Sequence, residues 1–182
     1  EAQRFNYLLK NQNKINFTKS RLRKSILIVT SIIPSETKEL LEFFASANIE
    51  FEKVYIKEHH LFKISPTIKS LIKNFPSFEI ITGNMSDAFK HSDIVYTANG
   101  SSVLLESVLN KKQTISLISL SSLPIPSIYK ATNLHFVYDV SSLSKILIKL
   151  INEPINLTFP VENNDYLYLD EKLNLWRDFI KK

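Results

Sequence analysis

At the centre of the chain stands Asp93-Ile-Val-Tyr-Thr-Ala-Asn-Gly-Ser-Ser-Val-Leu-Leu-Glu-Ser-Val-Leu109. Its first part is a short apolar run from Ile94 to Thr97, which predicts a buried strand. A polar loop containing one of only two glycines follows, and then a helix that we expect to begin at Ser101 or Ser102.

A strand that turns into a serine-capped helix directs backbone N–H groups and the positive end of the helix dipole toward one point. That arrangement favours an anion, so the stretch with Gly100, Ser101 and Ser102 predicts a phosphate site. Glu106 lies one helical turn behind Ser102 on the same face, where a carboxylate could bind ribose hydroxyls. The alternative is a plain helix cap that binds nothing, since fold does not fix function.

The composition is that of an ordinary globular protein of 182 residues, 44% hydrophobic and 23% charged. The absence of cysteine excludes disulfides, thiolate zinc sites and cysteine nucleophiles. The sequence has no apolar run of about 18 residues and no signal peptide, so we expect a cytoplasmic protein. The chain starts with Glu1 rather than Met, so we expect a fragment with a partner domain upstream.

The net charge of +5 comes mostly from scattered lysines, which is typical of a solvated surface. The tightest basic cluster runs from Lys19 to Lys24. We favour a solvated linker there and expect no nucleic-acid partner. The alternative is a peripheral contact with anionic lipid at the inner face of the membrane.

Apolar runs alternate with helical patterns along the chain, which predicts a doubly wound α/β fold with a parallel sheet. Right-handed crossovers favour the strand order 3-2-1-4-5-6. The expected division is an N-terminal helix and linker (1–24), a ligand-binding domain (25–152) and a C-terminal loop and crossing helix (153–182). The expected strands are 25–30, 51–56, 78–82, 94–97, 114–118 and 134–137. The expected helices within this domain are 35–47, capped by Ser35, then 66–74, 85–90, 102–109 and 141–152.

Several well-known motifs are missing from the sequence. It lacks the Gly-x-Gly-x-x-Gly dinucleotide fingerprint, the P-loop, the Gly-x-Ser-x-Gly elbow and His-Glu-x-x-His. The four histidines show no metal-ligand spacing, so we expect no metal site. We expect His91 and His135 to be structural, because both lie at the amino edge of the predicted sheet.

Two further groups of candidate residues follow strands of the predicted sheet. Lys57, His59 and His60 close the second strand, at the same edge as Ser101. A histidine there can donate to a phosphate oxygen, or neutralise a departing nucleotide as imidazolium. The alternative is a pair of loop histidines without a ligand. After the third strand, the turn from Thr82 to Met85 contains Gly83 and Asn84 and could face a base, or be only a turn.

These elements together resemble the C-terminal, donor-binding domain of a GT-B glycosyltransferase, which is Rossmann-like. The chain is most similar to bacterial surface-carbohydrate enzymes of the sialyltransferase, polysialyltransferase and CDP-glycerol glycerophosphotransferase type. Their Lys-x-His-Pro element is matched by Lys57-Glu58-His59-His60, and their Ser-Ser pair by Ser101-Ser102, with Glu106 behind it. His60 departs from the proline of the pattern.

The resemblance implies roles for these residues. His59 would assist catalysis at the donor phosphate, and Ser101 with Ser102 would hold that phosphate. Glu106 would bind the ribose, and Gly83 and Asn84 would face the base. Lys57, His60 and Gly100 complete the expected donor site.

The implied function is the nucleotide-sugar-binding half of a glycosyltransferase that acts in surface polysaccharide or glycan biosynthesis. The donor would be CMP-, CDP- or UDP-linked, the acceptor a glycan or lipid-linked glycan, and no cofactor would be tightly bound. The catalytic base would lie on the missing N-terminal GT-B domain, so the fragment alone would turn over little. The alternative is a non-catalytic Rossmann-like interaction module of an envelope-assembly complex.

Overall fold

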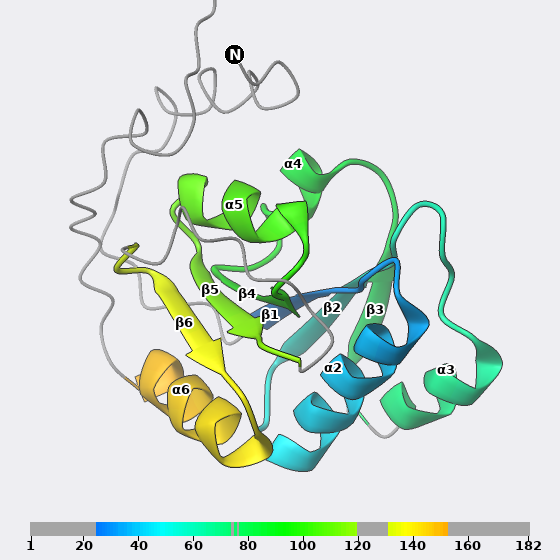
Figure 1. Ribbon diagram of the computed structural model, residues 1–182, viewed down its shortest axis with the longest axis horizontal. Coiled ribbons are helices and arrows are strands. Elements are labelled where there is room, and N and C mark those ends of the chain that lie inside the picture. The colour runs from blue at the N-terminus through cyan, green and yellow to red at the C-terminus, as the bar shows by residue number, and fades with distance from the viewer. Residues whose placement is uncertain (1–24, 74, 76, 120–130, 153–182) are drawn as a thin grey trace, which may run out of the picture.

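The computed structural model of the protein describes residues 25–73, 75, 77–119 and 131–152. Their six strands form one parallel sheet in the order β3-β2-β1-β4-β5-β6 (Figure 1). The strands are β1 (Ser25–Val29), β2 (Lys53–Lys57), β3 (Phe78–Ile81), β4 (Ile94–Ala98), β5 (Gln113–Leu117) and β6 (Leu134–Val137). The structure therefore confirms the predicted doubly wound, Rossmann-like α/β fold and its strand order. The predicted segments 1–24 and 153–182 lie outside the described residues.

Helices cover both faces of the sheet, as Figure 1 shows. One face carries α2 (Pro34–Ala47), α3 (Pro66–Ile72) and α6 (Val140–Asn152), and the other carries α4 (Met85–Ala88) and α5 (Ser102–Leu109). Strand β1 shows why both faces are buried. Ile26 and Ile28 pack in the cluster under α2, whereas Leu27 and Val29 pack in the cluster under α5. No helix among the described residues is long and apolar enough to cross a membrane.

Two strands start at other residues than predicted, and the ends of β1 to β5 each differ from the prediction by one residue. Strand β2 begins at Lys53, which pairs with Ser25, rather than at residue 51. Phe51 is buried against Phe44 ahead of the ladder, so its hydrophobicity reflects packing and not pairing. Strand β5 begins one residue early because Gln113 already pairs with Ile94.

The start of α2 also differs from the prediction, because Ser35 is not its cap. The helix begins at Pro34, whose fixed φ suits the first turn, so the N-cap is Ile33. Ile33 makes no side-chain cap bond, and the Oγ of Ser31, in the loop ahead of the helix, accepts from the backbone N–H of Ile33 at 3.1 Å. The same hydroxyl donates to Glu36 Oε2 at 2.5 Å, which links the loop to the first turn of the helix.

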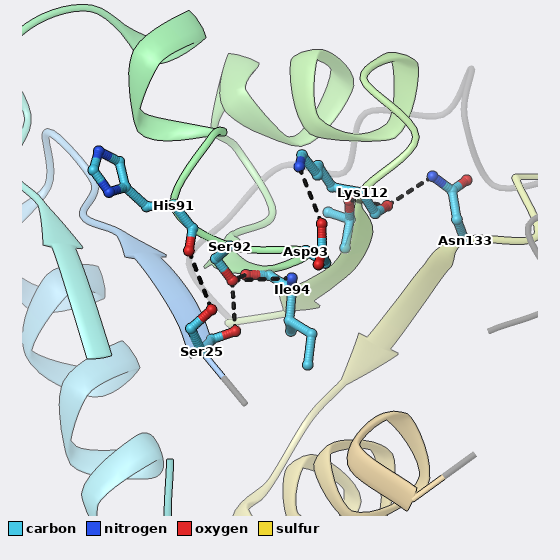
Figure 2. Close-up of polar contacts among 8 residues, drawn as sticks. Ser25, His91, Ser92, Asp93, Ile94, Lys112 and Asn133 are labelled. Atoms are coloured by element: carbon cyan, nitrogen blue, oxygen red, sulfur yellow. Dashed lines mark hydrogen bonds and ion pairs between the residues drawn. The ribbon is translucent and has the colours of Figure 1, made fainter. Parts of the chain in front are cut away.

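The amino edge of the sheet is held by hydrogen bonds of the chain to itself (Figure 2). The Ser25 hydroxyl donates to the carbonyl of His91 at 3.1 Å, and the buried Ser92 hydroxyl lies 2.6 Å from the carbonyl of Ser25. The His91 ring packs on Tyr55, with 4.9 Å between ring centroids. His91 therefore ties β1 to the segment ahead of β4, in agreement with its predicted structural role.

The same edge continues across β5 (Figure 2). Lys112 Nζ lies 3.4 Å from Asp93 Oδ1, and Asn133 Nδ2 donates to the Lys112 carbonyl at 2.8 Å. Next to it, His135 Nε2 lies 3.0 Å from Gln113 Oε1. Burial, and then the nearby charge of Lys149, lower the pKa of His135, which agrees with a neutral, structural imidazole.

Candidate functional site

The carboxyl edge of the sheet contains the point where the strand order reverses. Strand β1 lies between β2 and β4, and the chain leaves β1 toward α2 on one face and β4 toward α5 on the other. In sheets of this kind, ligands bind in the crevice outside the carboxyl ends of these strands. His59 follows β2 and Ser101 follows β4, so both lie at this edge, one strand to either side of β1. Two strand spacings of about 4.8 Å separate β2 from β4, a gap that side chains and a bound anion could bridge.

The N-terminus of α5 has the predicted form. Ser101 is the N-cap, and its Oγ accepts from the backbone N–H of Val103 at 3.3 Å. Because the oxygen serves the cap, the hydroxyl proton is directed elsewhere and can be donated to an anion. Glu106 is buried within the helix at 6% exposure, one turn behind Ser102. Its predicted contact with ribose stays a prediction.

The backbone of His59 is fixed by the loop that follows β1. Its N–H donates to Thr30 Oγ1 at 3.0 Å, and the Thr30 N–H donates to the Lys57 carbonyl at 3.1 Å. Beyond it, Glu58 Oε1 accepts from the Ile64 N–H at 3.0 Å, which closes the loop after β2. The role of Thr30 could not be predicted from the sequence, because a threonine after a buried strand is common.

A backbone contact sets the tautomer of the His59 imidazole. Its Nδ1 accepts from the Leu61 N–H at 3.3 Å, so in the neutral ring the proton lies on Nε2. Partial burial, and then the adjacent His60, lower the pKa of His59. The rings of His59 and His60 pack with centroids 4.4 Å apart, and His60 is exposed. These contacts favour a neutral imidazole that donates from Nε2 over the imidazolium that we also considered.

Gly83 and Asn84 lie farther from the crevice. They follow β3, the outermost strand on this side, three strand spacings of about 4.8 Å from β4. Gly83 adopts a φ of 89°, which explains the glycine, and Asn84 Oδ1 caps α4 by accepting from the Asp87 N–H at 2.8 Å. The structure thus gives both residues a structural reason, and a base-facing role for them stays a prediction.

Sequence reasoning overlooked the polar cluster after β1. Ser31, Glu36 and Thr37 are all buried, and the Ser31 N–H donates to Thr37 Oγ1 at 3.0 Å. These bonds hold the loop that follows β1, the strand between β2 and β4. Among the described residues, no three His, Asp or Glu side chains gather as a set of metal ligands.

Comparison with known proteins gives a fold. No protein-family model matches the sequence, and no curated protein matches it significantly. The chain is similar to a structure from Listeria monocytogenes described as a UDP-N-acetylglucosamine 2-epimerase, with a TM-score of 0.55 and 13% identity over 82% of this chain and 43% of the other. MurG from Acinetobacter baumannii gives a TM-score of 0.48 and 16% identity over 70% of this chain and 43% of MurG. The first likeness shows the Rossmann-like α/β fold, and the chain spans less than half the length of either structure.

Proposed function

We propose that this chain is the nucleotide-sugar-binding half of a glycosyltransferase of surface polysaccharide or glycan biosynthesis. The observation that carries the proposal is the placement of His59 and the N-terminus of α5 on the two sides of β1, at the carboxyl edge where the strand order reverses. One side supplies an N–H donor at neutral pH, and the other supplies a helix dipole and hydroxyl donors. Both features stabilise the negative charge of an anionic leaving group.

The proposed chemistry is transfer of the sugar from a CMP-, CDP- or UDP-linked donor. The bond between the anomeric carbon and the phosphate oxygen breaks, and its electron pair stays on that oxygen. His59 donates a hydrogen bond from Nε2 to the oxygen, while the N-terminus of α5 stabilises the phosphate charge. The acceptor hydroxyl forms the new bond to the anomeric carbon. Its proton goes to a base that we place on a second, N-terminal domain, so this chain alone would bind nucleotide and turn over little.

The proposal also includes the location, the acceptor and the cofactor requirement of the enzyme. We expect a cytoplasmic protein at the inner face of the membrane, acting on a glycan or lipid-linked acceptor without a tightly bound cofactor. No structural observation favours the alternative of a non-catalytic interaction module.

Calorimetric titration of the chain with CMP, CDP and UDP tests the proposal. At least one should bind, and the double variant Ser101→Ala/Ser102→Ala should weaken that binding by at least about 100-fold, because each lost bond to a charged group costs about 1.5–3 kcal/mol. His59→Ala should weaken binding as well. Ser65→Ala is the matched control, since Ser65 caps α3 by accepting from the Ile68 N–H at 3.3 Å. It should lower stability and leave affinity unchanged. Indifference of the wild-type chain to all three nucleotides would refute the proposal and leave the interaction module.

A further inference from the structure

Asn99 is a buried polar residue with half of its side chain unused. It follows β4 directly, is fully buried, and its Oδ1 accepts from the Ser116 hydroxyl at 3.2 Å. Its Nδ2, a donor of two hydrogen bonds, has no hydrogen-bond partner among the described residues. A buried donor without a partner costs about 1–3 kcal/mol, so such a group in a native site calls for a reason.

The side chain lies on the α5 face of the sheet. The Asn99 N–H donates to the Leu117 carbonyl at 3.0 Å, which extends the β4–β5 ladder by one residue. Ile115 and Leu117 pack in the cluster under α2, so the residue between them, Ser116, faces the other side. Thr114, on the same side as Ser116, contacts the Ser107 hydroxyl of α5 at 2.9 Å. The carboxamide of Asn99, bonded to Ser116, is therefore aimed into the space beneath the first turn of α5.

The loop backbone beside Asn99 is open to a ligand. Apart from its two chain neighbours, no described residue lies within 4 Å of the position that a Cβ would take on Gly100, and the φ of Gly100 is outside the left-handed region. Neither the backbone conformation nor contacts with described residues thus require glycine here. A glycine in such a place permits close approach of a ligand to the backbone.

From these observations we infer that Asn99 is a further ligand-binding residue, whose Nδ2 donates a hydrogen bond to an anionic oxygen held at the N-terminus of α5. The inference rests on the proposed function, because it adds a donor to the same phosphate site. Asn99 supplies the amide beneath the helix, while Ser101 supplies the hydroxyl at its cap. The ligand class is a phosphate or diphosphate group.

NMR of the side-chain amide of Asn99 in the wild-type chain tests the inference directly, with CDP and inorganic pyrophosphate as probes. Calorimetry of Asn99→Asp complements it, because aspartate keeps the shape and the acceptor for Ser116 but replaces the donor. We expect the amide resonances to shift on titration and the variant to bind CDP at least about 10-fold more weakly. Asn133→Ala is the matched control. Asn133 is equally buried, but its Nδ2 is occupied by the carbonyls of Val108 and Lys112, at 3.1 and 2.8 Å. It should lower stability and leave CDP affinity unchanged.

The outcomes separate this inference from the proposed function. If CDP binds without moving the Asn99 amide, and Asn99→Asp binds it as tightly, the inference is overturned and the donor site stands. If pyrophosphate moves the amide but no nucleotide binds, Asn99 is an anion ligand and the nucleotide-sugar proposal fails. If neither probe moves it and no nucleotide binds, both are wrong. The wild-type spectrum decides these points even if the variant does not fold.

Discussion

Replacing Tyr96 by phenylalanine should stabilise this protein. Tyr96 is fully buried in the middle of β4, and its hydroxyl has no hydrogen-bond partner in the part of the chain that the structure describes. Its ring packs near Phe44, with 6.3 Å between centroids. Burial, and then the charge of Glu39, raise the pKa of the phenol far above its ordinary value, so the group is a neutral hydroxyl cut off from water.

The magnitude follows from two opposing terms. Removing an unpaired buried hydroxyl relieves a desolvation cost of about 1–3 kcal/mol. The missing oxygen leaves a void of roughly 15 Å³, which at about 24 cal/mol per Å³ costs about 0.4 kcal/mol. The ring contacts with Phe44 remain. Tyr96→Phe should therefore raise the free energy of unfolding by about 1 kcal/mol.

Urea denaturation of wild type and variant, followed by circular dichroism, measures the difference. Calorimetry should show a melting temperature higher by about 2–4 °C for a chain of this size. Tyr138→Phe is the matched control, because Tyr138 is 64% exposed and the same deletion there should change stability by less than about 0.5 kcal/mol. A Tyr96→Phe variant less stable than wild type would show that the hydroxyl is paired, and our account of this part of the core would be wrong.

Three other perturbations separate roles within the structure. Gly83→Ala should cost about 1–2 kcal/mol in chemical denaturation because its φ is 89°, whereas Gly100→Ala should leave stability unchanged or slightly higher; equal costs would contradict this. Ser92→Ala should cost about 2 kcal/mol, because its buried hydroxyl makes bonds that tie β1 to β4, and a neutral effect on the melting temperature would argue against that role. Burial, and then the charge of Lys149, lower the pKa of His135 in the folded chain. Below the ordinary histidine pKa of 6.5, the unfolded chain therefore binds more protons than the folded chain does. The free energy of unfolding should fall as the pH drops from 6.5 toward the folded pKa. His135→Gln should show a smaller loss over that range in pH-dependent melting, and an unchanged slope would refute the assignment.

The fold was predictable because its signals are local and repeated. Each strand is a short apolar run between turn residues, and Ser101 caps its helix as its sequence context indicates. The boundaries were less predictable, because Phe51 is buried without pairing and Ser35 follows a proline that already starts α2.

The candidate site was predictable only in part. The pattern placed His59 and Ser101 at one edge, since parallel strands end on the same side. It did not reveal that Thr30 holds the His59 backbone or that Asn99 carries an unused donor. Both facts depend on neighbours that lie far apart in sequence, and no periodicity in the chain records them.

The two outer strands bear on how this protein associates with others. Strands β3 and β6 end the described sheet with four residues each, whereas every inner strand has five. A short border strand offers few unpaired main-chain groups to an incoming chain, and β3 presents the exposed Glu79 besides. Copies of this protein therefore have little template for extending the sheet from one molecule into the next. Larger assemblies are better built through the helical layers or the loops.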